Sequence, residues 1–161
     1  MIGQLFERLE GITNDEYLWE PAIGMWSTRV RDDGSVTVDG VGQRDVDPAP
    51  VTTIAWRLWH LSVDCLDSYT HRFVGDAPDL DPDARWFLDA DRAVDSLARS
   101  WERYRSEIAG RPRWWEELGS AWGPWSRHSV VDMSLHAGNE LVHHGAEIAL
   151  LRDLYRAQQD S

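Results

Sequence analysis

The chain has 161 residues, and its 16 basic and 28 acidic side chains give a formal net charge of −12. A field of this sign repels phosphate backbones, which argues against nucleic acid as a partner. No run of 18 apolar residues could span a bilayer, and "MIGQLFERLEG" lacks the apolar core of a signal peptide, so we expect one cytoplasmic domain (1–161) without a membrane partner. The single cysteine, Cys65, excludes an internal disulfide and a cysteine-rich zinc knuckle, so a metal would need histidine and carboxylate ligands.

The first part of the chain predicts short helices and a long connection. Apolar spacing predicts a helix over residues 2–10 that ends at Gly11, followed by a short helical piece in "TNDEYLWEP" with Thr13 or Asn14 as its N-cap. Residues 24–50 are rich in Gly, Asp and Pro, and the weak alternation in "SVTVDG" predicts at most a small hairpin there. Connections of this length often cover a site.

Three longer helices are predicted after this connection. The first covers "TIAWRLWHLSVDCLDSYTHRFV" with Thr52 or Thr53 as its N-cap, the second lies near 88–109, and the last occupies 135–155. The Asp/Pro-rich "GDAPDLDPDA" separates the first two, and a Trp- and Gly-rich connection at 113–125 precedes the last. Without a strong strand signal, the chain is predicted to be all-α: a four-helix bundle with a long loop or small hairpin between its first two helices.

The last helix carries polar side chains along one side. At 3.6 residues per turn, His136, Glu140, His143, His144 and Glu147 fall within an arc of about 100°. Such a stripe either faces solvent, as on any amphipathic helix, or meets a partner helix. Helical bundles often build metal sites from carboxylate and imidazole side chains that project inward from facing helices.

A metal site in a bundle requires a ligand from a second helix, and His60 in "WRLWHL" is the candidate. A lone histidine among tryptophans is more often a hydrogen-bonded core residue, so His60 becomes a candidate only if the stripe offers complementary donors. Glu140 and His144 rise from consecutive turns of one face and can converge on one ion. Glu140 with His143 is the alternative pair.

The neighbours of these residues have more ordinary interpretations. His136 and Asp64 either support the ligands from outside or lie in solvent. Glu147 either orients a ligand or pairs with an arginine, and the ion pair is the favoured alternative. Cys65 lies about 140° from His60 around an α-helix, so we expect a packed thiol that points away from any metal.

The motifs "TTIAWRLWHL" and "LHAGNELVHHGAEIALLRDLY", together with "YLWEP", "MWSTR" and "WGPW", resemble the DinB-like superfamily, which includes mycothiol-dependent maleylpyruvate isomerases and bacillithiol transferases. The resemblance implies a four-helix bundle with a divalent metal held by one histidine of the second helix and two ligands one turn apart on the last. On this chain the implied ligands are His60, Glu140 and His144. In having a Glu followed four residues later by a His, the ligand pair of the last helix is similar to that of the maleylpyruvate isomerases. Zn²⁺ is the expected ion, with Ni²⁺, Fe²⁺ and Mn²⁺ as alternatives.

The resemblance also implies an activity: S-transfer or isomerisation of a small electrophile with a low-molecular-weight thiol of the mycothiol type. Arg57, Arg152 and the tryptophan-rich loops are candidate contacts for a polar cosubstrate. Two other functions stay open, a non-catalytic metal-stabilised module for binding or dimerisation and a metal-dependent hydrolase. A fourth protein ligand would favour the module, because structural sites are saturated whereas catalytic sites stay open. A homodimer is a further expectation.

Overall fold

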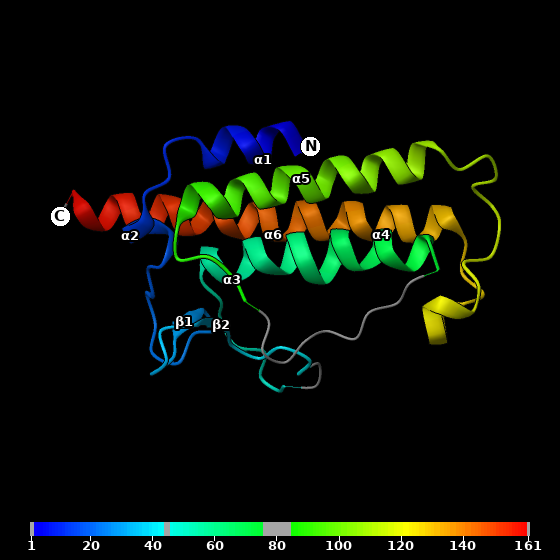
Figure 1. The fold of residues 1–161 in the computed structure, drawn as a ribbon. Coiled ribbons are helices and arrows are strands. Elements are labelled where there is room, and N and C mark those ends of the chain that lie inside the picture. The colour runs from blue at the N-terminus through cyan, green and yellow to red at the C-terminus, as the bar shows by residue number, and fades with distance from the viewer. Residues whose placement is uncertain (1, 44–45, 76–84, 161) are drawn as a thin grey trace.

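The protein is mostly helical in a computed structural model that describes residues 2–43, 46–75 and 85–160 (Figure 1). The predicted Asp/Pro-rich connection lies largely outside the described residues. No helix in the described ranges is long and apolar enough to cross a membrane. The helices are α1 (Ile2–Leu9), α2 (Asn14–Tyr17), α3 (Ile54–Trp59), the π-helix η1 (His60–Asp67), α4 (Ser68–Phe73), α5 (Ala90–Ala109), the 3-10 helix η2 (Ser120–Trp125) and α6 (Val130–Gln159).

Side-chain caps determine where the helices begin. The Thr53 hydroxyl accepts a hydrogen bond from the backbone of the first turn of α3, as one of the two predicted caps. Helix α6 begins at Val130 and not near Leu135, because Ser129 and Asp132 form a reciprocal capping box. This box lengthens the last helix by more than one turn at its start.

Helices α3, η1 and α4 follow one another without a break, but η1 has a different hydrogen-bond pattern. A π-helix bonds residue i to residue i+5, so its turn contains more residues than an α-turn. Residues five apart in η1 therefore lie on nearly the same face. Positions 60 and 65 are such a pair.

A small hairpin occupies the predicted excursion. Strand β1 (Thr28–Val30) pairs antiparallel with β2 (Val36–Val38). Just before β1, the Trp26 N–H donates to the Val51 carbonyl at 3.0 Å, and the Trp26 carbonyl accepts from the Thr53 N–H at 2.9 Å. The excursion is thereby fixed against the beginning of α3.

The helical segment α3–η1–α4 lies beside α5 and α6, and α1 packs against α6 (Figure 1). The colours in Figure 1 show that α6 runs antiparallel to α3–η1–α4. The core between these helices contains completely buried side chains such as Leu58, Leu61, Leu97 and Ile148. This packing brings η1 into contact with the polar stripe of α6, as the sequence predicted.

Candidate metal centre

The structure brings together three residues from η1 and α6. Nε2 of His60 lies 3.3 Å from Oε2 of Glu140, and Nε2 of His144 lies 3.2 Å from the same oxygen. The two imidazole rings meet edge to face, with centroids 4.8 Å apart. These side chains are only 13–17% exposed, so this part of the stripe meets a partner helix and not solvent.

Each imidazole has a second carboxylate on its other nitrogen. Nδ1 of His60 lies 3.0 Å from Oδ2 of Asp64, and Nδ1 of His144 lies 2.7 Å from Oε2 of Glu147. Nη1 of Arg57 also lies 3.1 Å from Nδ1 of His144. When each Nδ1 proton is donated to its outer carboxylate, a cation at the central carboxylate would find both Nε2 lone pairs directed toward it. Metal-binding histidines are usually oriented in this way by an outer carboxylate. Of the two interpretations of Asp64, the supporting role agrees with this geometry.

The carboxylates and imidazoles of the cluster shift one another's pKa values. Burial lowers the pKa of His60, but hydrogen bonds outweigh burial and raise this pKa to about 12. The partners in these bonds are Asp64, Cys65 and Glu140. Hydrogen bonds from His144 and His60 hold the pKa of Glu140 well below its usual range, whereas burial lowers the pKa of His144. Two imidazole nitrogens and one ionised carboxylate form a set of metal ligands that suits a divalent cation.

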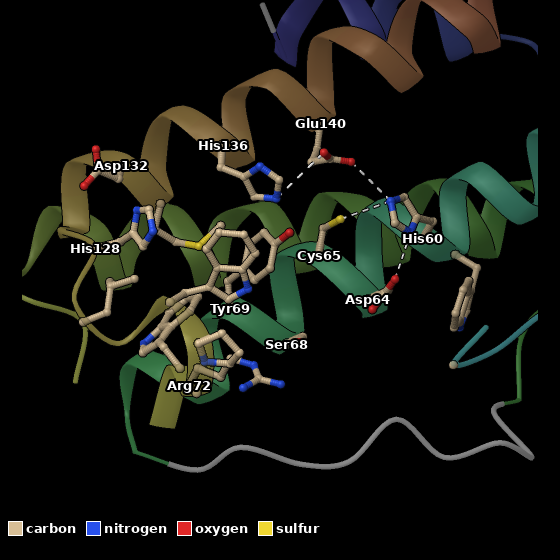
Figure 2. Close-up of a pocket in the computed structure, with 18 of the residues that line it drawn as sticks. His60, Asp64, Cys65, Ser68, Tyr69, Arg72, His128, Asp132, His136 and Glu140 are labelled. Carbon is tan, nitrogen blue, oxygen red and sulfur yellow. Dashed lines mark hydrogen bonds and ion pairs between the residues drawn. The ribbon is translucent and has the colours of Figure 1, made fainter. Parts of the chain in front are cut away.

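Cys65 also belongs to this cluster, contrary to the prediction from the sequence. Its Sγ lies 3.4 Å from Nε2 of His60, and the ligand atoms of His60, Cys65 and Glu140 all lie within 4.8 Å of one another. Figure 2 shows the thiol pointing toward the imidazole beneath Glu140. The prediction was wrong because it assumed an α-helix, whereas the π-helix η1 places residues five apart on one face.

The other histidines of the stripe lie further out. Nε2 of His136 is 3.8 Å from Oε1 of Glu140, and its side chain is 53% exposed. The His143 side chain is 59% exposed, its Nε2 is 3.3 Å from Oε1 of Glu147, and its ring stacks on that of His144. His143 is therefore directed away from the central carboxylate.

The two arginines proposed as cosubstrate contacts are bound within the protein, so that expectation was wrong. Arg57 is an ion-pair partner of Glu147, which confirms the predicted pairing of this glutamate. The Arg152 side chain is 1% exposed and binds both carboxylate oxygens of Glu16, at 2.6 and 3.0 Å. It also donates to backbone carbonyls at the end of α1.

A cavity of about 750 Å³ adjoins the cluster, and His60, Cys65 and Glu140 form part of its wall. Figure 2 shows this wall with residues from both helical segments. The predicted loops, 24–50 and 113–125, both contribute lining residues, as expected. Much of the lining is aromatic: Trp26, Trp56, Trp59, Tyr69, Trp122 and Trp125.

Two tryptophans in contact connect the loop at 24–50 to the cluster. The Trp56 ring stacks on His60 with centroids 5.0 Å apart and an interplanar angle of 13°. Trp26 packs against Trp56 at an interplanar angle of 39°, with ring centroids 5.8 Å apart. Nε1 of Trp56 donates to the Asp39 carbonyl at 2.9 Å. The orientation of the His60 ring is thus supported from the hairpin region.

Sequence reasoning did not identify Tyr69 and Arg72, which line the cavity beyond Cys65. The positions 65, 69 and 72 follow a helical spacing, so a common face could have been inferred for them. His60 belongs to the same face, but α-helical spacing does not predict this, because residues 60–67 form a π-helix.

The comparisons with known proteins agree with this architecture. A family model described as the DinB superfamily matches residues 2–148, a range that includes His60, Glu140 and His144. Searches of curated proteins and of solved structures gave no match. Because the family match spans most of the 161 residues, the chain belongs to the DinB superfamily.

Proposed function

We propose that His60, Glu140 and His144 hold a divalent cation, preferably Zn²⁺, in a four-helix bundle that carries out S-transfer or isomerisation of a small electrophile. The reaction would use a low-molecular-weight thiol of the mycothiol type. The observation that carries the proposal is the convergence of two imidazole Nε2 atoms on one carboxylate at the wall of an aromatic cavity. A cation bound there would lower the pKa of a coordinating thiol, which then reacts as the thiolate near neutral pH.

The residues around the cluster support this chemistry in distinct ways. Asp64 and Glu147 fix the tautomer and orientation of the two imidazoles by accepting their Nδ1 protons. The tryptophan walls offer apolar surface to an electrophile and exclude water from the reacting atoms. Arg72 and Asp132 add charged groups to the lining for the polar part of a cosubstrate. The cavity volume of about 750 Å³ lies within the usual range for small-molecule sites.

One observation favours a second function, a non-catalytic module in which the metal only joins η1 to α6. The Cys65 thiol lies close enough to the cluster to act as a further protein ligand. A cation surrounded by four protein ligands has the saturated coordination of a structural site. The two functions therefore differ in a measurable property, thiol-dependent turnover by the metal-loaded protein.

The test begins with protein purified without a polyhistidine tag, whose metal content is measured after loading with Zn²⁺. Thiol consumption is then followed against a panel of electrophiles, with metal-free protein and His60→Ala as controls. His71→Ala is the matched control, because His71 lies in the same helical segment but is exposed. We expect about one ion per chain, metal-dependent thiol consumption, loss of both in His60→Ala and retention of both in His71→Ala.

Two other results would contradict the proposal in different ways. Full metal occupancy without turnover of any thiol and electrophile would contradict the catalytic function and support the non-catalytic module. Failure of the wild-type protein to bind metal stoichiometrically would contradict the proposal that these residues form a metal centre.

A further inference from the structure

The distances around His60 agree with those between ligands of a single tetrahedral ion. Bonds of about 2.1 Å to nitrogen or oxygen and about 2.3 Å to sulfur separate the donor atoms of such an ion by roughly 3.4–3.6 Å. Nε2 of His60 lies 3.3 Å from Oε2 of Glu140 and 3.4 Å from Sγ of Cys65. The thiol and the carboxylate thus each lie at a ligand–ligand distance from the imidazole, and all three ligand atoms lie within 4.8 Å of one another.

We propose that the Cys65 thiolate is a ligand of the metal centre, beside His60, Glu140 and His144. The inference rests on the metal centre of the proposed function and not on its thiol chemistry. The Cys65 side chain is 3% exposed, so it is withdrawn from bulk solvent, yet it lines the cavity at the same wall as His60 and Glu140. The π-helix makes this placement possible, because an α-helical turn would direct residue 65 elsewhere.

The added thiolate has consequences for the choice of ion. Thiolate ligands select Zn²⁺ over Mn²⁺ and Mg²⁺, which prefer oxygen donors. The negative charges of Cys65 and Glu140 together balance the charge of a divalent cation. With four protein donors, thiol chemistry requires a fifth coordination position, which catalytic zinc sites reach in some transition states. A centre that remains four-coordinate would belong to the non-catalytic module.

X-ray absorption at the zinc edge tests the proposal directly on the wild-type protein, loaded with Zn²⁺ in buffer free of added thiol. We expect a sulfur scatterer at about 2.3 Å besides nitrogen and oxygen at about 2.0–2.1 Å. Cys65 is the only cysteine of the chain, so a thiolate signal has one source. Met133 also lines the cavity, so its thioether is a second possible source of a sulfur signal. The variant Cys65→Ser distinguishes the two sources, because only a signal from Cys65 disappears in it.

Substitution with Co²⁺ supplies a second measurement. A thiolate ligand gives a sulfur-to-cobalt charge-transfer band in the near ultraviolet, which imidazole and carboxylate ligands do not give. We expect this band in wild-type protein and its loss in Cys65→Ser, whose fold is checked by circular dichroism. The wild-type spectrum alone remains decisive if that variant does not fold.

The possible results separate this inference from the proposed function. Stoichiometric Zn²⁺ with only nitrogen and oxygen ligands would overturn the role of Cys65 and leave the centre of His60, Glu140 and His144 intact. A sulfur signal that persists in Cys65→Ser would also overturn it. Absence of stoichiometric binding would overturn both proposals.

Discussion

Helix α6 carries two polar clusters, one buried and one half-buried, and they differ in how their hydrogen bonds are completed. Around Arg152, one guanidinium meets both oxygens of Glu16 and backbone carbonyls at the end of α1, so donors match acceptors. Around Glu140, the Nε2 atoms of two histidines and a carboxylate face one another. Buried polar networks are stable when every member is satisfied. The first cluster is therefore complete without ring protons, whereas the second depends on protons carried by its histidines, which a bound cation would replace.

Exposure follows the same division. The side chains of Arg152 and Glu16 are 1% and 4% exposed, whereas those of Glu140 and His144 are 17% and 13% exposed. Glu140 also lines a cavity that a small molecule can enter. One helix thus contributes a closed ion pair to the core and the Glu140 carboxylate to the wall of the cavity.

The largest expected effect is a loss of stability when the buried pair of Arg152 and Glu16 is broken. Arg152→Ala should lower the free energy of unfolding by about 3–5 kcal/mol, because it leaves Glu16 buried without a partner. Urea denaturation measures the change. Arg8→Ala is the control, since Arg8 pairs with exposed Asp153 and its loss should cost less than about 1 kcal/mol. Equal losses in the two variants would show that burial does not distinguish these pairs.

The next effect concerns the accessible cluster and the choice between two adjacent histidines. His144→Ala should weaken metal binding by more than about 100-fold, the upper end of the effect of a supporting residue. His143→Ala should leave the affinity unchanged, because His143 is exposed and directed toward Glu147. Isothermal titration with Zn²⁺ measures both. If His143→Ala releases the ion and His144→Ala retains it, the pair Glu140 and His143 holds the metal.

Removal of a carboxylate that supports a ligand should have a smaller effect on metal affinity than removal of the ligand itself. Asp64→Asn should lower the metal affinity by about 10–100-fold, because Asp64 accepts the Nδ1 proton of His60. Asp67→Asn is the matched control on the same helix, where Asp67 instead accepts hydrogen bonds from Arg103 at 2.6 and 2.8 Å. A competition assay with a zinc indicator compares the two variants. Similar affinities would mean that Asp64 does not orient the imidazole.

The smallest expected effect comes from an apolar neighbour. Trp56→Leu should weaken metal binding by about 2- to 10-fold, because it removes the ring that stacks on His60. Trp125→Leu is the control: Trp125 lines the same cavity but is largely exposed. The same competition assay applies. A loss in Trp125→Leu as large as in Trp56→Leu would assign the effect to the cavity in general.

Local patterns in the sequence predicted most of the helical architecture and the convergence of two helices. The apolar spacing of α5 and α6, the Thr53 cap and the polar stripe all depend on residues three or four positions apart, which is the range of helical contacts. The metal ligands themselves remain a prediction. What the structure adds is that His60, Glu140 and His144 lie together.

Other features depend on contacts that no local pattern contains. Arg152 and Glu16 are 136 positions apart, so their pairing arises only in the folded chain. Cys65 was misplaced for a different reason: apolar spacing does not reveal a change from α- to π-helical hydrogen bonding. A shift of one hydrogen-bond register moved a thiol from an expected packing position to the candidate metal centre.

The stack that supports His60 also makes a loop glycine part of the centre. Gly40 has φ +68°, and a Cβ atom there would lie about 2.5 Å from ring atoms of Trp26. Because Trp26 packs on Trp56 and Trp56 on His60, we expect a larger residue at position 40 to displace Trp26 and weaken the support of the imidazole. A residue without a side chain therefore leaves the space in which Trp26 packs beside the ring that supports His60.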